Sequence, residues 1–338
     1  MAGKIDLLSK SATELEVVLA EFDLPKFRVK QFFSAFHKNL ADDFANITTL
    51  PAVLREEIAK KYSIKPVEIT KSIRAKDGTE KYLLKLFDNN FVEAVYIPSS
   101  SRNTLCVSTM VGCPFGCTFC ESGKMGFTRN LTVSEIIGQF YMIKKLHEVT
   151  NIVFMGIGEP LANYDNLISA VRLMSHVDGQ NFSPRRMTVS TVGLVEGIKR
   201  LANEKLSLNL AISLHSPFQE ERVKIIPSAE KYPINDIMSA SHYFINRTGR
   251  KVSFEYTVIE GVNDSAQHAD ELRRITQNSQ IMVNIIPLNK GTAEMKKSAI
   301  VAKNFANLLF ERGIETAVRN SRGNDIFAAC GQLSSKAR

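Results

Sequence analysis

Three cysteines crowd one short segment of the chain. Cys113, Cys117 and Cys120 lie in GCPFGCTFCESG with the spacing C-x3-C-x2-C, and Pro114 and Gly116 break any regular structure between them. Three thiolates in such a loop satisfy three irons of a 4Fe-4S cube and leave the fourth iron open to another ligand. The spacing therefore predicts a 4Fe-4S cluster with one exchangeable site.

Two other interpretations of these cysteines stay open. A structural zinc ion would need a fourth protein ligand, and the nearest histidine, His147, lies one helix away. Three buried cysteines without metal are the second alternative. The chain has five cysteines, an odd number, and its N-terminus MAGKIDLLSK has no apolar core of signal-peptide length. We therefore place the iron–sulfur cluster first and expect a cytoplasmic protein.

Polar residues directly follow several apolar runs. MGIGEP ends one run with Gly158 and Glu159, where a glycine lets the backbone approach a ligand closely. A buried carboxylate at a strand end needs a cation, which an amino-acid ligand or a nearby arginine would supply. Small polar groups end further runs: Ser190, Ser213, His215 and Asn289. For His215, a purely structural role is as consistent with the residues as a ligand role.

Strand-like and helical segments alternate in the second part of the chain. The strand patterns cover residues 104–110, 151–156, 186–191, 208–214, 251–258 and 281–287. Such alternation predicts an α/β fold with parallel strands and helical crossovers. Six units favour a partial or complete (βα)6 barrel with its chemistry at the carboxyl ends of the strands, and a doubly wound open sheet is the alternative.

Two smaller regions precede the barrel. Between Leu7 and Ser63 apolar residues recur at helical spacing, which predicts a small helical domain. Between Gly78 and Pro98 two β-rich runs flank the turn Asp88-Asn89-Asn90, which predicts a hairpin. The expected division is 1–70 for the helical accessory domain, 71–100 for a β-hairpin linker and 101–338 for the barrel.

Longer motifs resemble a known family. LCVSTMVGC, GFTRNLTVSEIIGQ, MGIGEPLAN, SPRRMTVSTVG, ISLHSP, GVNDS and RGNDIFAACGQL closely resemble the RlmN/Cfr family of radical S-adenosylmethionine (SAM) RNA adenine methyltransferases, over nearly the whole chain. The resemblance implies a barrel whose 4Fe-4S cluster, held by Cys113, Cys117 and Cys120, binds SAM at its open iron. It also implies a set of residues around SAM: Gly158, Glu159, Ser190, Ser213, Leu214, His215 and Asn289.

The resemblance also implies a mechanism. A first SAM methylates Cys330 in AACGQL, and a radical from a second SAM removes a hydrogen from that S-methyl group, which then joins the adenine. Cys106 in TLCVSTM attacks the Cys330 sulfur, releases methylated RNA and leaves a transient disulfide. Glu93 lies beside the target adenine as a proton acceptor or a base holder. Without the resemblance, we would interpret Glu93 as a solvent-exposed surface residue, and Cys106 and Cys330 as small buried hydrophobic residues.

Partners follow from the same motifs. These motifs are closer to RlmN than to Cfr, which implies that the methylated atom is carbon 2 of an adenine in structured large-subunit rRNA. A tRNA is a further candidate substrate, and carbon 8 is the alternative site of methylation. The net charge of +8 agrees with an RNA partner. We expect a flavodoxin-type electron donor, a monomer and no membrane partner, since the apolar runs are too short to span a bilayer. A radical SAM enzyme for small molecules and a redox-sensing Fe-S RNA-binding protein remain as alternatives.

Basic residues and departures from the family pattern bear on substrate choice. Arginines in loops around the barrel are expected to contact phosphates: Arg129, Arg185, Arg186, Arg319 and Arg322. Met110 stands where glutamine is usual, Glu121 follows the third cluster cysteine, and Phe327 stands where aspartate is usual. The loop after Asn289 is also short. These departures leave the predicted catalytic residues in place and put the RNA substrate in question.

Overall fold

Parallel strands form the centre of the protein. The computed structural model describes residues 4–64, 67–289 and 295–334. Within these ranges the sheet order is β14-β13-β12-β11-β10-β9-β6-β5-β4-β3. In this sheet, the neighbouring strands from β14 through β9 to β6 run parallel. The parallel strands are β6 (Thr104–Cys106), β9 (Asn151–Phe154), β10 (Met187–Thr191), β11 (Asn209–Ser213), β12 (Val252–Val258), β13 (Ile281–Pro287) and β14 (Thr316–Val318).

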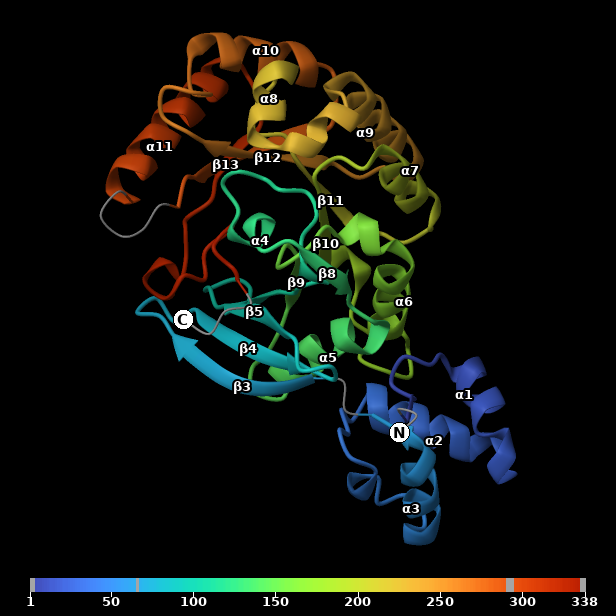
Figure 1. Cartoon of the computed structure of the whole chain (residues 1–338). Helices are drawn as coiled ribbons and strands as arrows, with labels where there is room; N and C mark the ends of the chain where they lie inside the picture. Colours follow the sequence, from blue (N-terminus) through green and yellow to red (C-terminus); the bar gives the residue numbers. More distant parts are fainter. Residues whose placement is uncertain (1–3, 65–66, 290–294, 335–338) are drawn as a thin grey trace.

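Helices cover the outer side of this curved sheet (Figure 1). On β12, Phe254 and Tyr256 are fully buried, and the Tyr256 ring stacks on Phe305 with centroids 5.2 Å apart. Strand alternation turns Glu255 to the opposite, inner face. None of the described helices has the length and apolarity to cross a membrane. The helices are α5 (Val133–Lys144), α6 (Tyr164–Ser175), α7 (Val195–Asn203), α8 (Gln219–Ile225), α9 (Ile234–Thr248), α10 (Ala266–Thr276) and α11 (Met295–Glu311).

The predicted partial barrel is confirmed. All six predicted strand regions contain a parallel strand, and β14 adds one that the sequence pattern did not predict. No pairing among the described residues joins β14 back to β6, so the barrel stays open. The first predicted strand, 104–110, is divided: β6 ends at Cys106, and Met110 begins β7 (Met110–Gly112), which pairs with β8 (Phe127–Asn130) in a separate small sheet.

Three antiparallel strands extend the barrel sheet. β4 (Glu80–Leu86) and β5 (Phe91–Ile97) form the expected hairpin, and β3 (Val67–Arg74) pairs with β4. Because β5 pairs with β6, this region is a continuous part of the main sheet and not a separate linker. β3 was missed because most of its residues are exposed, so it lacks the apolar alternation of a half-buried strand.

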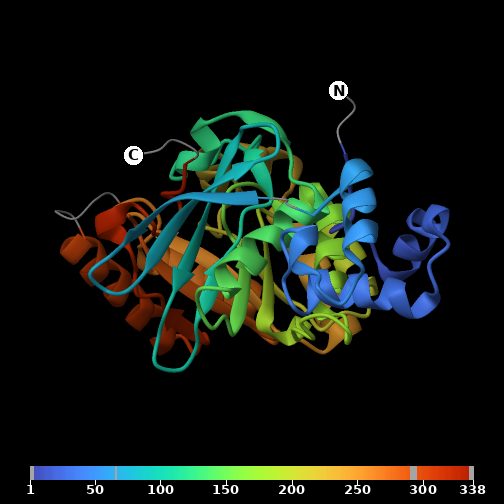
Figure 2. The ribbon, with the colours of Figure 1, turned by 90° about the horizontal axis from the view of Figure 1, so that it is seen from below.

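The N-terminal helices form as the apolar spacing predicts. They are α1 (Ala12–Val18), α2 (Lys26–His37) and α3 (Ala52–Lys61), and they gather at one end of the molecule (Figures 1 and 2). Proline directly precedes α2 and α3, which suits the first turn of a helix. The buried His37 Nδ1 lies 2.8 Å from the Tyr141 hydroxyl of α5, so α2 packs directly on the barrel helices.

Candidate active site at the barrel mouth

The predicted cluster loop runs from β7 to the short helix α4 (Glu121–Lys124). The Cys113 N–H donates to the Gly126 carbonyl at 2.8 Å, and the Cys120 N–H donates to the Cys117 carbonyl at 3.1 Å. Gly112 has φ +74°, and a Cβ on it would lie 1.9 Å from the Gly126 oxygen. This close backbone approach requires glycine and fixes where the loop leaves β7.

Burial acts strongly on the thiols of two of the three cluster cysteines. Burial raises the pKa of Cys113 to about 12, and the pKa of Cys117 is also raised, first by burial and then by the neighbouring thiols. Among the described residues, no three His, Cys, Asp or Glu side chains converge as ligands of one metal ion must. Thiolates that each bind a different iron need not converge in this way. The loop therefore fits a 4Fe-4S cluster better than a zinc ion.

Glu159 is a buried carboxylate in the loop that follows β9. It is 3% exposed, and its two oxygens accept the N–H groups of Leu161 at 3.1 Å and Val192 at 2.8 Å. Burial raises its pKa to about 7. No ion pair joins it to a described arginine or lysine, so the arginine alternative of the sequence analysis is not realised there. A buried carboxylate without a cationic partner among the described residues is suited to bind the amino group of SAM.

Gly158 positions Glu159. It has φ +109°, and a Cβ on it would lie 2.6 Å from the Cβ of Met110. The Glu159 N–H donates to the Met110 sulfur at 3.4 Å. Met110, one of the departures from the family pattern, is thus a buried support beneath the Gly158-Glu159 backbone.

His215 has one ring nitrogen without a partner. Its backbone is left-handed, with φ +58°, and its Nδ1 accepts the Thr257 N–H at 2.9 Å. Burial lowers its pKa to about 3, so the ring is neutral and Nε2 carries the proton. Nε2 is buried and has no hydrogen-bond partner among the described residues, and the ring packs on Phe119 of the cluster loop. A buried donor without an acceptor fits a ligand at the mouth.

The other residues assigned to SAM differ in how they reach the mouth. Ser190 donates its hydroxyl to the Phe154 carbonyl at 2.7 Å, and the Ser213 carbonyl accepts a bond from Arg222. The Leu214 side chain is fully buried in the core, so only its backbone can meet a ligand. Asn289 donates to the Cys330 carbonyl at 3.2 Å, which turns it toward the C-terminal segment. The loop that follows Asn289, at 290–294, lies outside the described residues.

Arg222 is a residue that the sequence analysis missed. It is 0% exposed, and its guanidinium donates to the carbonyls of Val192, Ser213 and Tyr232. Burial lowers its pKa to about 10, so it stays cationic at neutral pH, and its charge offsets part of the rise in the pKa of Cys117. The polar stretch QEERVK predicts a solvent-exposed arginine, so no local sequence pattern indicates that this charge is buried.

A C-terminal segment, residues 328–334, crosses the mouth between α4 and β5 (Figure 1). The Glu121 N–H donates to the Gly331 carbonyl at 2.8 Å, which joins the segment to the cluster loop. The Ser334 N–H donates to the Glu93 carboxylate at 2.8 Å, which joins it to β5. These contacts hold Cys330 between the cluster loop and Glu93.

Cys106 and Cys330 come together although they are 224 residues apart (330 − 106). Cys106 is buried at the end of β6, and Cys330 is exposed at the mouth. Burial first, and then the neighbouring Cys330, raise the pKa of Cys106 to about 12. Although Cys330 is accessible, surrounding protein atoms displace enough bulk water to raise its pKa to about 11. The positive charge of Arg319 offsets part of this rise in the pKa of both thiols.

Arg319 therefore faces the mouth, where its guanidinium binds protein groups. Its guanidinium lies 3.1 Å from the Glu255 carboxylate and 3.7 Å from the Met155 sulfur. Asn284 also donates to Glu255, at 2.9 Å. This inward ion pair differs from the phosphate contact expected for Arg319.

Glu93 is not the solvated surface residue that an isolated hairpin would suggest. It is 2% exposed, and the Lys81 ammonium lies 3.0 Å from its carboxylate. Lys81 also donates to the Phe327 carbonyl at 3.2 Å. The pair therefore connects the hairpin to the segment that carries Cys330.

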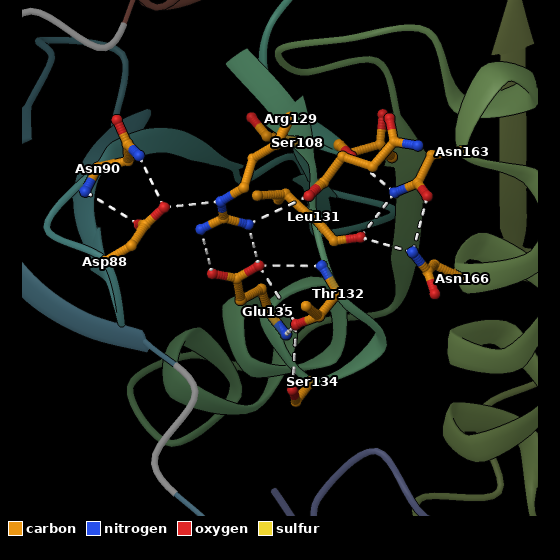
Figure 3. A network of polar contacts seen from close by, with 12 residues as sticks. Asp88, Asn90, Ser108, Arg129, Leu131, Thr132, Ser134, Glu135, Asn163 and Asn166 are labelled. Atoms are coloured by element: carbon orange, nitrogen blue, oxygen red, sulfur yellow. Dashed lines mark hydrogen bonds and ion pairs between the residues drawn. The ribbon is translucent and has the colours of Figure 1, made fainter. Parts of the chain in front are cut away.

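Arg129 forms ion pairs with carboxylates of the protein itself (Figure 3). It forms a bidentate ion pair with Glu135, at 2.7 and 2.8 Å, and a third bond to Asp88 at 2.7 Å. Arg185 and Arg186 precede β10 and so lie at the opposite end of the strands from the mouth. The ion pairs of Arg129 and the positions of Arg185 and Arg186 therefore do not support the phosphate contacts expected for them at the mouth.

Comparison with known proteins agrees with this geometry. The model of the Radical SAM superfamily matches residues 107–272. A protein from Thermus thermophilus described as a probable dual-specificity RNA methyltransferase RlmN is 43% identical over 331 residues, 95% of this chain and 93% of that protein. A dual-specificity RNA methyltransferase RlmN from Nautilia profundicola is 41% identical over 337 residues, 94% of this chain and 95% of that protein.

A solved structure shows the same fold over nearly the full length. The crystal structure of a radical SAM methyltransferase from Sphaerobacter thermophilus matches with a TM-score of 0.92 and 39% identity, over 98% of this chain and 100% of that one. The chain belongs to the RlmN family of radical SAM RNA methyltransferases.

Proposed function

We propose that this enzyme methylates carbon 2 of an adenine in structured large-subunit rRNA, and in tRNA, through Cys330 as methyl carrier and Cys106 as resolving thiol. One observation carries the proposal: the C-terminal segment holds Cys330 between the cluster loop and Glu93, with Cys106 beside it. The description of its relatives as dual-specificity enzymes supports two RNA classes.

Methylation of carbon 2 requires a residue that carries the methyl group. Carbon 2 of adenine has no lone pair with which to attack a methyl sulfonium. The cluster and SAM, when bound, supply the methyl group and a radical that abstracts hydrogen. The Cys330 thiolate accepts the methyl group, and loss of one hydrogen atom leaves a methylene radical that bonds to the adenine carbon. Cys330 thereby joins the enzyme covalently to the RNA.

Release needs a second thiol. The adduct would lose one electron, which the bound cluster would accept, and the proton on carbon 2, which Glu93 would accept. The Cys106 thiolate then bonds to the Cys330 sulfur. The bond from that sulfur to the methylene breaks, its electron pair passes to the carbon, and a proton completes the methyl group. The Cys106–Cys330 disulfide needs two electrons from an external reductant. We assign a flavodoxin-type donor to the electron supply and a monomer to the active form.

The remaining roles follow from burial and charge. Glu93, whose carboxylate pairs with Lys81, would accept a proton from the adenine or hold its amino group. Cys113, Cys117 and Cys120 would hold the cluster. Glu159 would bind the ammonium of SAM, and the unpartnered Nε2 of His215 would donate a hydrogen bond to an acceptor group of SAM. The base must leave its stack, which is least costly in a loop or bulge.

Two cysteine variants test the proposal. Holoenzyme carrying Cys330→Ala should form no 2-methyladenosine in an RNA fragment that the wild-type enzyme methylates, because no sulfur can carry the methyl group. Cys106→Ala should accumulate a protein–RNA crosslink, detected as a band of reduced mobility that nuclease removes. Normal methylation by Cys330→Ala would refute the carrier role, and normal release by Cys106→Ala would refute the resolving role.

The methylated carbon needs a separate measurement. Nucleosides of rRNA and tRNA from cells with and without this gene can be resolved by mass spectrometry. Loss of 2-methyladenosine supports the proposal, whereas loss of 8-methyladenosine supports the carbon 8 alternative. Formation of 5′-deoxyadenosine by the reduced enzyme separates catalysis from mere redox sensing on RNA.

A further inference from the structure

Phe327 combines three features that no other described residue combines. It is 47% exposed, its backbone is left-handed with φ +54°, and its carbonyl accepts a bond from Lys81, the partner of Glu93. The other described residues with positive φ, glycine aside, include no exposed aromatic ring. The ring therefore stands at the rim of the mouth, three residues before Cys330.

The left-handed backbone makes this position unfavourable for phenylalanine. Asparagine, aspartate and glycine adopt positive φ with least strain, whereas a bulky aromatic residue costs more. Such strain persists where surrounding contacts determine the backbone, and it is concentrated at functional sites. An exposed ring recovers little of this cost by packing, so the folded protein alone does not explain it.

Surrounding contacts do determine this backbone. The Gly323 N–H donates to Asp77 at 3.0 Å, and Asp325 accepts the Lys76 N–H at 3.1 Å. The Ala328 N–H donates to the Gly323 carbonyl at 2.8 Å. The loop before Phe327 is therefore fixed to the turn between β3 and β4, so the backbone that carries the ring is held before any partner binds.

We propose that Phe327 is a stacking surface for a nucleobase that flanks the target adenine. This inference rests on the proposed RNA function and specifies how that RNA is held. A flat exposed ring accepts any base on its face, and stacking of this kind is worth about 1–3 kcal/mol per base. Lys76 is exposed on the same rim and Arg322 is half-exposed, so phosphates beside the stacked base meet positive charge.

The test compares Phe327→Asn, Phe327→Tyr and Phe310→Ala in the holoenzyme. Phe310 is a matched control because it is 79% exposed on α11. The probe is an RNA fragment that the wild-type enzyme methylates, with 2-aminopurine placed beside the target adenine so that stacking quenches its fluorescence. We expect Phe327→Asn to weaken RNA binding about tenfold and to abolish the quenching, while Phe327→Tyr and Phe310→Ala bind like wild type.

Thermal unfolding of the same proteins excludes a merely structural role. Phe327→Asn should unfold at the same or a higher temperature than wild type, because asparagine relieves the left-handed strain. Unchanged RNA binding by Phe327→Asn would overturn the inference, and so would a joint loss of thermal stability and RNA affinity. Absence of 2-methyladenosine in the wild-type reaction would count against the proposed function alone, since binding and quenching are measured without turnover.

Discussion

Replacing Lys81 with methionine tests whether the buried ion pair holds the mouth together. The Lys81 and Glu93 side chains are 8% and 3% exposed, so solvent screens their interaction little. Methionine fills a similar volume, so the change removes the charge and the donor while largely keeping the packing. The variant loses the 3.0 Å pair with Glu93 and the 3.2 Å bond to the Phe327 carbonyl.

The expected loss is about 3–5 kcal/mol of the free energy of unfolding, the usual effect of removing one partner of a buried pair. Urea unfolding of the reconstituted enzyme under anaerobic conditions measures it. The double variant Lys81→Met/Glu93→Gln removes both charges, so it should be more stable than Lys81→Met by about 1–3 kcal/mol. A loss below about 1 kcal/mol for Lys81→Met, or equal stability of the single and double variants, would refute the reasoning.

Three further predictions concern the loop, a buried histidine and the arginine network. Gly112→Ala should purify with little iron and sulfide, because its Cβ would collide with the Gly126 carbonyl. His37 has a folded pKa of about 3 against 6.5 unfolded, so its contribution is present above pH 6.5 and is lost as pH falls. His37→Gln should therefore reduce the loss of urea stability between about pH 7.5 and 5.5 by roughly 1.4 kcal/mol. Arg129→Met should lose about 2–3 kcal/mol of stability with the Glu135 pair, yet bind RNA as wild type does; weakened binding at unchanged stability would restore the phosphate role.

Features encoded locally could be predicted from the sequence. The cysteine spacing marks the loop after the first barrel strand, and the alternating apolar runs mark each parallel strand, because both signals lie within a few residues. The turn at Asp88-Asn89-Asn90 likewise indicates the β4–β5 hairpin.

Features that depend on contacts between distant parts of the chain could not be predicted from the sequence. Glu93 is buried because Lys81 and the C-terminal segment close over it, and no local pattern encodes that covering. Arg222 lies in a polar stretch and becomes buried only when α8 packs beneath the cluster loop. The proximity of Cys106 and Cys330 likewise needs the whole barrel between them, and only the family resemblance pointed to it.

The register between β5 and β6 divides the site into a fixed half and an adjustable half. Val95 pairs with Cys106, and the Ser108 hydroxyl donates to the Glu93 carbonyl at 2.6 Å, so a backbone ladder sets the spacing of Glu93 and Cys106. Cys330 belongs to a segment held by a few bonds to neighbouring elements. Evolution or engineering of substrate range would therefore act through the exposed side chains in and directly before this segment, such as Phe327, where substitutions leave the geometry of the strands intact.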